Sequence, residues 1–470
     1  MISNGIVLIN TNVSHPPVSP VGLEYVGETL VDAGIPLQVI DLSFTTDWKA
    51  TLKHELENAD PVLVGLSIRN IDDSSYVSRQ SFLPWIKEVT EEIRRQSDSF
   101  ILLGGVGFST DPVTALEYCG ADAGIAGDGE DAIRALYTRL SANDGYFDLP
   151  NIAYRHDNKI LCSPRAYVDL KHTPPPRRHL FDNKRYEQFG AIVGIETKRG
   201  CAGKCIFCAD PVAKGNRIRL RPSHIVVQEF QDLLSQEVSW FHLADSEFNQ
   251  PIDHAKDICR AIIDAGIGNK IHWYTYASPA PFDRELVRLM KQAGCSGINF
   301  GMDSLHNGQL RRLGRRHTVS DIKHLVGILE AEGINYMADL LIGCPGENEE
   351  TLRTTIETAK RLDIPLVGMA GGIRVYEGTQ LKKQIDESFS KNDILIIKDG
   401  LRYYMSPALG DDPFGLIQEL TGDDERFLTL AAPGDTDSYN YADDEHLSEL
   451  IRQGARGAYW DILHKDRNKK

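Results

Sequence analysis

Two features are missing from this chain of 470 residues: long apolar runs and an excess of positive charge. No apolar run approaches the roughly 18 to 20 residues of a membrane-spanning helix, and the first residues lack the basic region of a secretion signal. The formal charge is -16 at pH 7, so the protein repels phosphate backbones and anionic membranes. We therefore expect a cytoplasmic protein that binds neither nucleic acid nor membrane.

Cysteine is scarce over most of the chain. Five of the eight cysteines stand alone, which favours reduced, buried thiols over a disulfide framework: Cys119, Cys162, Cys259, Cys295 and Cys344. Only Cys119 lies within the first 150 residues, and no cysteine follows Cys344. A second cluster near either end of the chain would therefore lack its ligands.

The other three cysteines, Cys201, Cys205 and Cys208, have the spacing C-x3-C-x2-C. Three thiolates without a fourth can hold three corners of a four-iron four-sulfur cluster and leave one iron open to an outside ligand. Structural zinc prefers paired C-x2-C units or a distant pair of histidines, and only His224 follows soon after. We favour the cluster over zinc or over three unliganded thiols, and an open iron indicates chemistry.

The first third of the chain has the pattern of a doubly wound sheet. Short apolar runs at residues 6–9, 37–42, 62–68 and 100–103 alternate with helical patterns, which predicts a parallel sheet covered on both faces. Ligands of such sheets bind beyond the carboxyl ends of the strands. The candidate binding residues there are Asn12, Ser43, Arg69, Asn70, Gly104, Gly105, Gly127, Gly129 and Glu130. The glycines would let the backbone approach a large ligand closely.

We divide the chain into four parts. Residues 1–145 form the doubly wound domain, and residues 146–188, with three consecutive prolines, form a linker. Residues 189–390 contain six repeats of strand and helix, which predicts a partial (β/α)6 barrel with its active site at the carboxyl ends of the strands. Residues 391–470 form a small α-rich extension that closes the substrate pocket. Its candidate pocket residues, which could equally serve packing, are Tyr403, Tyr404 and Trp460.

The barrel strands are expected at residues 191–197, 240–244, 271–277, 296–301, 336–342 and 366–375. Each is followed by a helical pattern.

The cysteine motif, with Phe207 before its last cysteine and Arg199-Gly200 ahead of it, resembles the radical S-adenosylmethionine (radical SAM) superfamily. The resemblance implies that the open iron binds SAM through its amino and carboxylate groups. It also implies that an electron from the cluster cleaves SAM to methionine and a 5′-deoxyadenosyl radical. An external one-electron reductant of the flavodoxin or ferredoxin type is then an expected partner.

The same resemblance implies further contacts to SAM. The polar group Asp245-Ser246-Glu247 follows the second barrel strand, where the superfamily binds the amino end of SAM. "INFGMDSL" places Asp303 and Ser304 at the ribose or methionyl end, and Arg316 corresponds to the cation on the carboxylate. "GCPGE" puts Gly343 and Pro345 beside adenine.

The amino-terminal stretches "GGVGFSTDP" and "IAGDGEDAI" resemble the cobalamin-binding domain of one large class of radical SAM enzymes. This resemblance implies cobalamin as a further cofactor. The motif Asp-x-His-x-x-Gly, whose histidine binds cobalt in other corrinoid proteins, is absent. The lower face of cobalt is therefore expected to lack a histidine ligand, and Arg69 or Asn70 could approach it.

The main hypothesis is a cobalamin-dependent radical SAM methyltransferase that acts on an unactivated carbon of a small molecule. The alternatives are a cobalamin-assisted radical cyclisation or ring rearrangement, transfer of the 3-amino-3-carboxypropyl group of SAM without cobalamin, and a non-catalytic corrinoid or iron-sulfur sensor. The negative charge favours a small-molecule substrate, but the sequence specifies neither its identity nor the oligomeric state.

Overall fold

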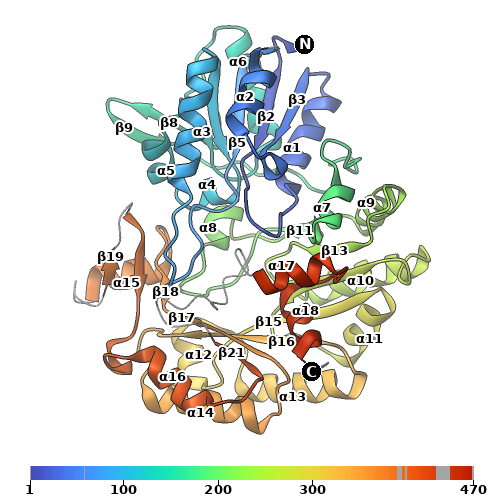
Figure 1. The fold of residues 1–470 in the computed structure, drawn as a ribbon, viewed down its shortest axis with the longest axis vertical. Helices are drawn as coiled ribbons and strands as arrows, with labels where there is room; N and C mark the ends of the chain where they lie inside the picture. Colours follow the sequence, from blue (N-terminus) through green and yellow to red (C-terminus); the bar gives the residue numbers. More distant parts are fainter. Residues whose placement is uncertain (1, 58, 389–393, 397–399, 430–444, 468–470) are drawn as a thin grey trace.

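The computed structural model describes the whole chain apart from residues 1, 58, 389–393, 397–399, 430–444 and 468–470. Figure 1 shows two α/β units stacked on each other, with the amino-terminal sheet in blue above and the barrel in yellow and orange below. The carboxyl-terminal helices, in red, lie beside the barrel where the two units meet.

The amino-terminal unit is the predicted doubly wound sheet. Its strand order is β3-β2-β5-β6-β7-β8-β9, and its first five members are parallel: β2 (Ile6–Asn10), β3 (Leu37–Asp41), β5 (Leu63–Ser67), β6 (Phe100–Gly104) and β7 (Ala123–Ile125). β2 pairs with β3 on one side and with β5 on the other. The order in which the chain adds strands to the sheet therefore reverses at β2. A ligand crevice is expected at the carboxyl ends of these strands.

The side chains of β2 alternate between the two faces of the sheet, and helices cover both faces. Ile6 and Leu8 point to one face and Val7 and Ile9 to the other, and all four are buried. The first face packs on α1 (Val21–Asp32) and α6 (Glu130–Ser141), and the second on the remaining helices: α2 (Trp48–Glu57), α3 (Leu83–Gln96), α4 (Val106–Thr110) and α5 (Pro112–Cys119).

The region expected to be a linker, residues 146–188, instead begins with two more strands of the same sheet. β8 (Ile152–His156) and β9 (Lys159–Cys162) form an antiparallel hairpin beside β7. Asp157 and Asn158 form its tight turn with φ angles of 48° and 61°, a left-handed conformation that Asp and Asn tolerate. This two-residue turn between alternating segments is the signal that the prediction missed.

The barrel contains seven parallel strands in the order β10-β13-β14-β15-β16-β17-β21. Six of them overlap the predicted ranges: β10 (Val193–Ile195), β13 (Trp240–Leu243), β14 (His272–Ala277), β15 (Cys295–Asp303), β16 (Tyr336–Ile342) and β17 (Val367–Gly371). The seventh, β21 (Phe427–Thr429), comes from the extension and pairs with the edge of β17. The α/β fold class and the partial barrel are thus confirmed, with one strand added.

The outer helices of the barrel are α9 (Ser223–Ser235), α10 (Ile252–Asp264), α11 (Arg284–Gln292), α13 (Val319–Glu332), α14 (Glu349–Arg361) and α16 (Pro413–Thr421). They cover the outward side chains of the strands, such as Phe241, Ile298 and Ala338, in one large core. Successive strand residues point to opposite faces, so the neighbours His242, Asn299 and Asp339 point into the barrel.

The last two helices of the extension pack against the barrel, and Trp460 enters its interior beside Met337 and Leu366. α17 (Glu445–Arg452) and α18 (Tyr459–Arg467) pack together, and Trp460 lies against Tyr274 and against Gly297, where a Cβ would come within 2.7 Å of the Trp460 ring. Tyr403 and Tyr404 are buried on β20 (Arg402–Tyr404), away from the cavity described below, so of the three candidate pocket residues only Trp460 reaches it.

The remaining elements are short. They are β1 (Ile2–Ser3), η1 (Leu42–Phe44), β4 (Ala59–Asp60), α7 (Asn183–Gln188), β11 (Lys198–Arg199), α8 (Asp210–Lys214), β12 (Arg219–Leu220), α12 (Asn307–Arg312), β18 (Ile373–Arg374), α15 (Gln380–Ser388), β19 (Ile394–Ile396) and η4 (Pro407–Leu409). Among the described helices, none has the length and apolar character that crossing a bilayer requires.

Candidate active site

A cavity of about 650 Å³ lies between the two units, at the carboxyl ends of both sets of strands. Eight of the nine amino-terminal residues selected from the sequence line it: Asn12, Arg69, Asn70, Gly104, Gly105, Gly127, Gly129 and Glu130. The barrel contributes side chains from its first four strands, and α17 and α18 contribute the far wall. Ligands of the two units would therefore meet in one enclosed space.

Ser43, the ninth residue, stands behind the cavity wall. Its hydroxyl donates to the Asn12 carbonyl over 2.6 Å and accepts from the Asn10 amide over 3.0 Å. It supports the loop after β2 without lining the cavity.

The amino-terminal wall fits a large flat ligand such as a corrin. A Cβ on Gly104 would meet no atom within 4 Å, so this glycine leaves open space beside the cavity. Gly105 has φ +96°, and a Cβ there would lie 2.5 Å from the Ile68 carbonyl. The side-chain amide nitrogen of Asn12 is buried and unpaired, so it is available to a ligand acceptor.

The three cysteines lie on the loop between β11 and α8 and are partly buried. Among the described residues, no three His, Cys, Asp or Glu side chains converge as they would around a single metal ion. Burial raises the pKa of all three thiols, that of Cys205 to about 11. Thiols of this kind stay protonated until a metal binds, so cluster assembly releases protons here.

Arg315 connects the cluster loop to the barrel. Its Nη1 donates to Cys205 Sγ over 3.2 Å and to Glu247 Oε1 over 2.9 Å, and its Nε donates to Asp303. The neighbouring Arg316, selected from the sequence, is exposed and donates to the Ala202 carbonyl over 3.0 Å. The sequence "GRRH" offers two adjacent arginines. The path of the backbone after α12 determines that the side chain of Arg315, and not that of Arg316, enters the site.

The carboxylate of Asp245, which was expected to bind the amino end of SAM, is instead fully hydrogen-bonded to other residues of the protein. It is 3% exposed, and its two oxygens accept from Thr197 N, Thr197 Oγ1, Lys198 N and Lys198 Nζ over 2.5 to 3.2 Å. Four hydrogen bonds use the capacity of a carboxylate, so Asp245 holds the start of the cluster loop and has no oxygen left for the SAM amino group. Ser246 lines the cavity, and its hydroxyl lies beside Asp210, whose pKa it helps to lower.

Ser304 is also structural, because its hydroxyl bonds to Thr355 Oγ1 over 3.1 Å and accepts from His306 N. Gly343 and Pro345 form a rigid turn in which Glu347 accepts from Gly343 N over 2.5 Å and Gln309 donates to the Pro345 carbonyl. The sequence reasoning did not select Glu347, whose pKa burial raises to about 7.

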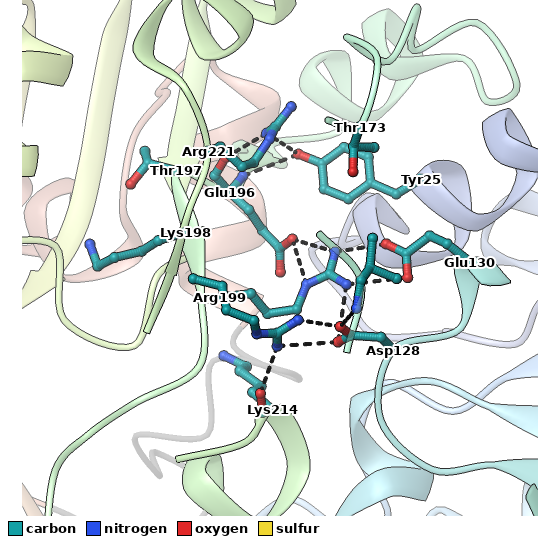
Figure 2. A network of polar contacts seen from close by, with 12 residues as sticks. Tyr25, Asp128, Glu130, Thr173, Glu196, Thr197, Lys198, Arg199, Lys214 and Arg221 are labelled. Carbon is teal, nitrogen blue, oxygen red and sulfur yellow. Dashed lines mark hydrogen bonds and ion pairs between the residues drawn. The ribbon is translucent and has the colours of Figure 1, made fainter. Parts of the chain in front are cut away.

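An ion network joins the two units next to the cluster loop (Figure 2). Arg199, two residues before Cys201, pairs with Asp128 at 3.2 Å, Glu130 at 2.9 Å and Glu196 at 2.9 Å, and Arg219 pairs with Asp128. The acidic side chains of the Gly-rich turn therefore bind residues of the barrel unit, and the whole turn borders the cavity. Because these partners lie far apart in the sequence, no local pattern predicts that they pair.

Two family models match this chain in tandem. Residues 7–137 match the B12 binding domain, and residues 195–359 match the radical SAM superfamily. Tryptophan 2-C-methyltransferase of Streptomyces laurentii is 29% identical, over 98% of this chain and 96% of its own length. The cytidylyl-2-hydroxyethylphosphonate methyltransferase of Streptomyces wedmorensis is 23% identical over 79% of this chain and 78% of its own length.

Solved structures agree with this relation over the whole chain. The radical SAM methyltransferase TsrM of Kitasatospora setae, solved with tryptophan and a SAM analogue, matches with a TM-score of 0.91 and 29% identity, covering 99% of this chain and 100% of TsrM. TsrM solved with cobalamin and a [4Fe-4S] cluster matches with a TM-score of 0.90 and 27% identity over the full length of both chains. The chain therefore belongs to the radical SAM enzymes with an amino-terminal B12 binding domain, and it is a cobalamin-dependent methyltransferase of that class.

Proposed function

We propose that this methyltransferase transfers a methyl group to carbon 2 of the indole ring of tryptophan, or of a close tryptophan derivative. The observation that carries the proposal is an aromatic compartment in the barrel that opens directly toward the B12 binding domain. The full-length similarity to a tryptophan 2-C-methyltransferase supports the same substrate.

The compartment has a lining that suits an aromatic amino acid. Its walls include His242, Tyr274, Tyr276, Tyr459 and Trp460, all of which border the cavity. Burial lowers the pKa of His242 to about 4, so this ring is neutral at pH 7. A neutral aromatic lining favours a flat apolar ring over a charged phosphorylated substrate.

When bound, the iron-sulfur cluster, SAM and cobalamin supply the methyl group, its carrier and the redox chemistry. We assign Cys201, Cys205 and Cys208 to the three protein-bound irons. The glycines of the amino-terminal wall would receive the corrin, and Arg69 or Asn70 would contact it, since both border the cavity just after β5. Ser246 and Glu247 face SAM, whereas Asp245 keeps the cluster loop in place.

The fold brings these sites to one cavity. The ion network around Arg199 fixes the cluster loop against the Gly-rich turn of the B12 binding domain. Trp460 fills the interior of the barrel beside Gly297 and Tyr274. An external one-electron reductant of the flavodoxin or ferredoxin type remains part of the proposal, because a cluster of this kind requires a source of electrons.

The test is anaerobic reconstitution with iron, sulfide and hydroxocobalamin, followed by metal analysis. We expect about four irons and about one cobalt per chain. The loaded protein is then incubated with tryptophan, a low-potential reductant and SAM that carries a deuterated methyl group. Labelled 2-methyltryptophan by mass spectrometry supports the proposal. Full cofactor loading without labelled product excludes tryptophan, and an unlabelled cyclised product would instead support the cyclisation alternative.

A further inference from the structure

One buried acceptor inside the barrel has no partner. Asn299 on β15 is 5% exposed, and its Oδ1 makes no hydrogen bond in the described part of the chain. Its neighbours Ile298 and Phe300 point outward into the helix-covered core, so Asn299 points inward. It borders the cavity between the two units. A buried amide oxygen left unpaired destabilises the protein, and a bound ligand with a donor would satisfy it.

The orientation of the Asn299 amide is determined by Asp339. Asp339 lies on the adjacent strand β16, and the Asn299 side chain donates a hydrogen bond to its carboxyl group. Burial raises the pKa of Asp339 to about 7, and both the protonated and the ionised carboxyl offer an oxygen that accepts from Nδ2. Because Nδ2 is engaged behind the wall, Oδ1 is the amide atom that remains for the cavity.

The surroundings of Asn299 suit a flat ring more than a charged group. Tyr276 is its partner on β14, and the ring of His242 lies 5.1 Å from that of Tyr276 in an edge-on arrangement. The rings of Trp460 and Tyr274 pack edge-on against each other and also border the cavity. Asp245 and Glu196, two other cavity carboxylates, are already paired with Lys198 and Arg199.

We propose that Asn299 is the specificity-determining residue of the substrate compartment, with its Oδ1 accepting a hydrogen bond from the ring N–H of an indole substrate. The inference rests on the proposed function and identifies the feature of the substrate that the barrel recognises. Asp339 is a positioning residue, which acts by keeping the amide oxygen toward the cavity.

A ring N–H fits this acceptor better than the α-ammonium group of an amino acid. A buried ammonium needs a counter-charge as well as a hydrogen bond, and the amide oxygen of Asn299 carries no charge. A neutral N–H on an apolar ring satisfies the acceptor without bringing a charge into the aromatic wall. A site built to bond a donor also rejects an analogue that lacks the donor, since the acceptor is then buried unpaired.

The experiment compares tryptophan with 3-(benzothiophen-3-yl)alanine, in which sulfur replaces the ring N–H, and with 3-indolepropionate, which lacks the α-amino group. Dissociation constants are measured by anaerobic calorimetry on the cofactor-loaded protein. We expect the wild type to bind benzothienylalanine about 10 to 100 times more weakly than tryptophan. In Asn299→Leu, which has similar volume and no acceptor, we expect the two ligands to differ by less than about threefold.

Two further variants make the test specific. Met337→Leu changes an apolar neighbour of Asn299 on β16 and should keep the discrimination of the wild type. Asp339→Leu leaves Asn299 in place but releases its amide, so partial loss of discrimination is expected there. Circular dichroism and iron content establish that each variant is folded and loaded.

Each outcome is informative. Unchanged discrimination in Asn299→Leu, in an enzyme that methylates tryptophan, overturns the assignment of Asn299 and leaves the proposed function standing. If Asn299→Leu instead loses only the preference for tryptophan over 3-indolepropionate, the residue recognises the ammonium group and the ring N–H assignment is wrong. A wild type that neither binds nor methylates tryptophan overturns the proposed function, and this inference with it.

Discussion

At the scale of single residues, the cysteine triplet offers the most direct test. Cys201→Ala, Cys205→Ala or Cys208→Ala each removes one proposed cluster ligand, so we expect loss of the bound iron and of turnover in every case. The matched control is Cys162→Ala, because Cys162 is exposed on β9 at the far edge of the amino-terminal sheet. It should keep the full iron content. Normal turnover in any triplet variant would contradict the ligand assignment.

A second residue-scale prediction concerns Asp339 and pH. Its pKa is 3.8 in the unfolded reference and about 7 in the folded protein, because burial disfavours the charged carboxylate. Between these values the folded state holds a proton that the unfolded chain has lost, so the free energy of unfolding falls as pH rises. The slope from this group approaches about 1.4 kcal/mol per pH unit.

Asp339→Asn should therefore gain stability relative to wild type as pH rises from about 4 to about 7. Denaturant unfolding at several pH values measures the difference. Asp264→Asn, at the exposed end of α10, is the control and should follow the wild-type profile. A pH-independent difference between Asp339→Asn and wild type would show that this carboxyl titrates normally in the fold.

At the scale of elements, the loop between β5 and α3 links the B12 binding domain to the barrel. Asp72 is 1% exposed and bonds to Arg374 on β18 at 2.9 Å, and Ser74 bonds to Tyr376 over 2.6 Å. Tyr76 packs directly on Gly372 and faces Tyr403. Arg69 and Asn70 begin this loop and border the cavity, so the attachment of the loop helps to fix their positions there.

Asp72→Asn leaves the buried Arg374 guanidinium without a counter-charge. We expect a loss of about 3 kcal/mol in the free energy of unfolding and a lower cobalt content after reconstitution, with the iron content unchanged. Asp73→Asn is the control, since the Asp73 carboxylate accepts hydrogen bonds from Ser75 and Ser78 within its own loop. It should cost less than about 1 kcal/mol. Equal effects of the two variants would argue against a stabilising role of the ion pair between Asp72 and Arg374.

At the scale of the whole molecule, Arg178 connects the two units. It is fully buried, with Nε 2.6 Å from Glu24 on α1 and Nη1 2.6 Å from Glu229 on α9. Arg178→Met would leave the buried Glu24 without its cationic partner, while Glu229 keeps Arg221 at 2.7 Å, so we expect a loss of about 3 to 5 kcal/mol in the free energy of unfolding. The adjacent Arg177 is half exposed and pairs with Glu28 and Asp32. Arg177→Met should cost at most about 1 kcal/mol, and denaturant melts of both variants measure the contrast.

Features that depend on local spacing could be predicted from the sequence. Three cysteines within eight residues indicate a cluster with an open iron, because ligands so close along the chain must be close in space. Apolar runs such as Ile6 to Ile9 predict buried parallel strands, since each strand buries both of its faces. The glycines that border the cavity were likewise found from their places at strand ends.

Which side chains enter the site could not be predicted in this way, because it depends on contacts between distant segments. Asp245 and Arg316 have suitable chemistry and position in the sequence, yet Lys198 saturates the first and solvent surrounds the second, while Arg315 reaches Cys205. β21 joins the barrel across about sixty residues of chain from β17, and the partner of Asn299 lies on another strand. Such contacts depend on the packing of distant segments, whose free energies local patterns along the chain do not encode.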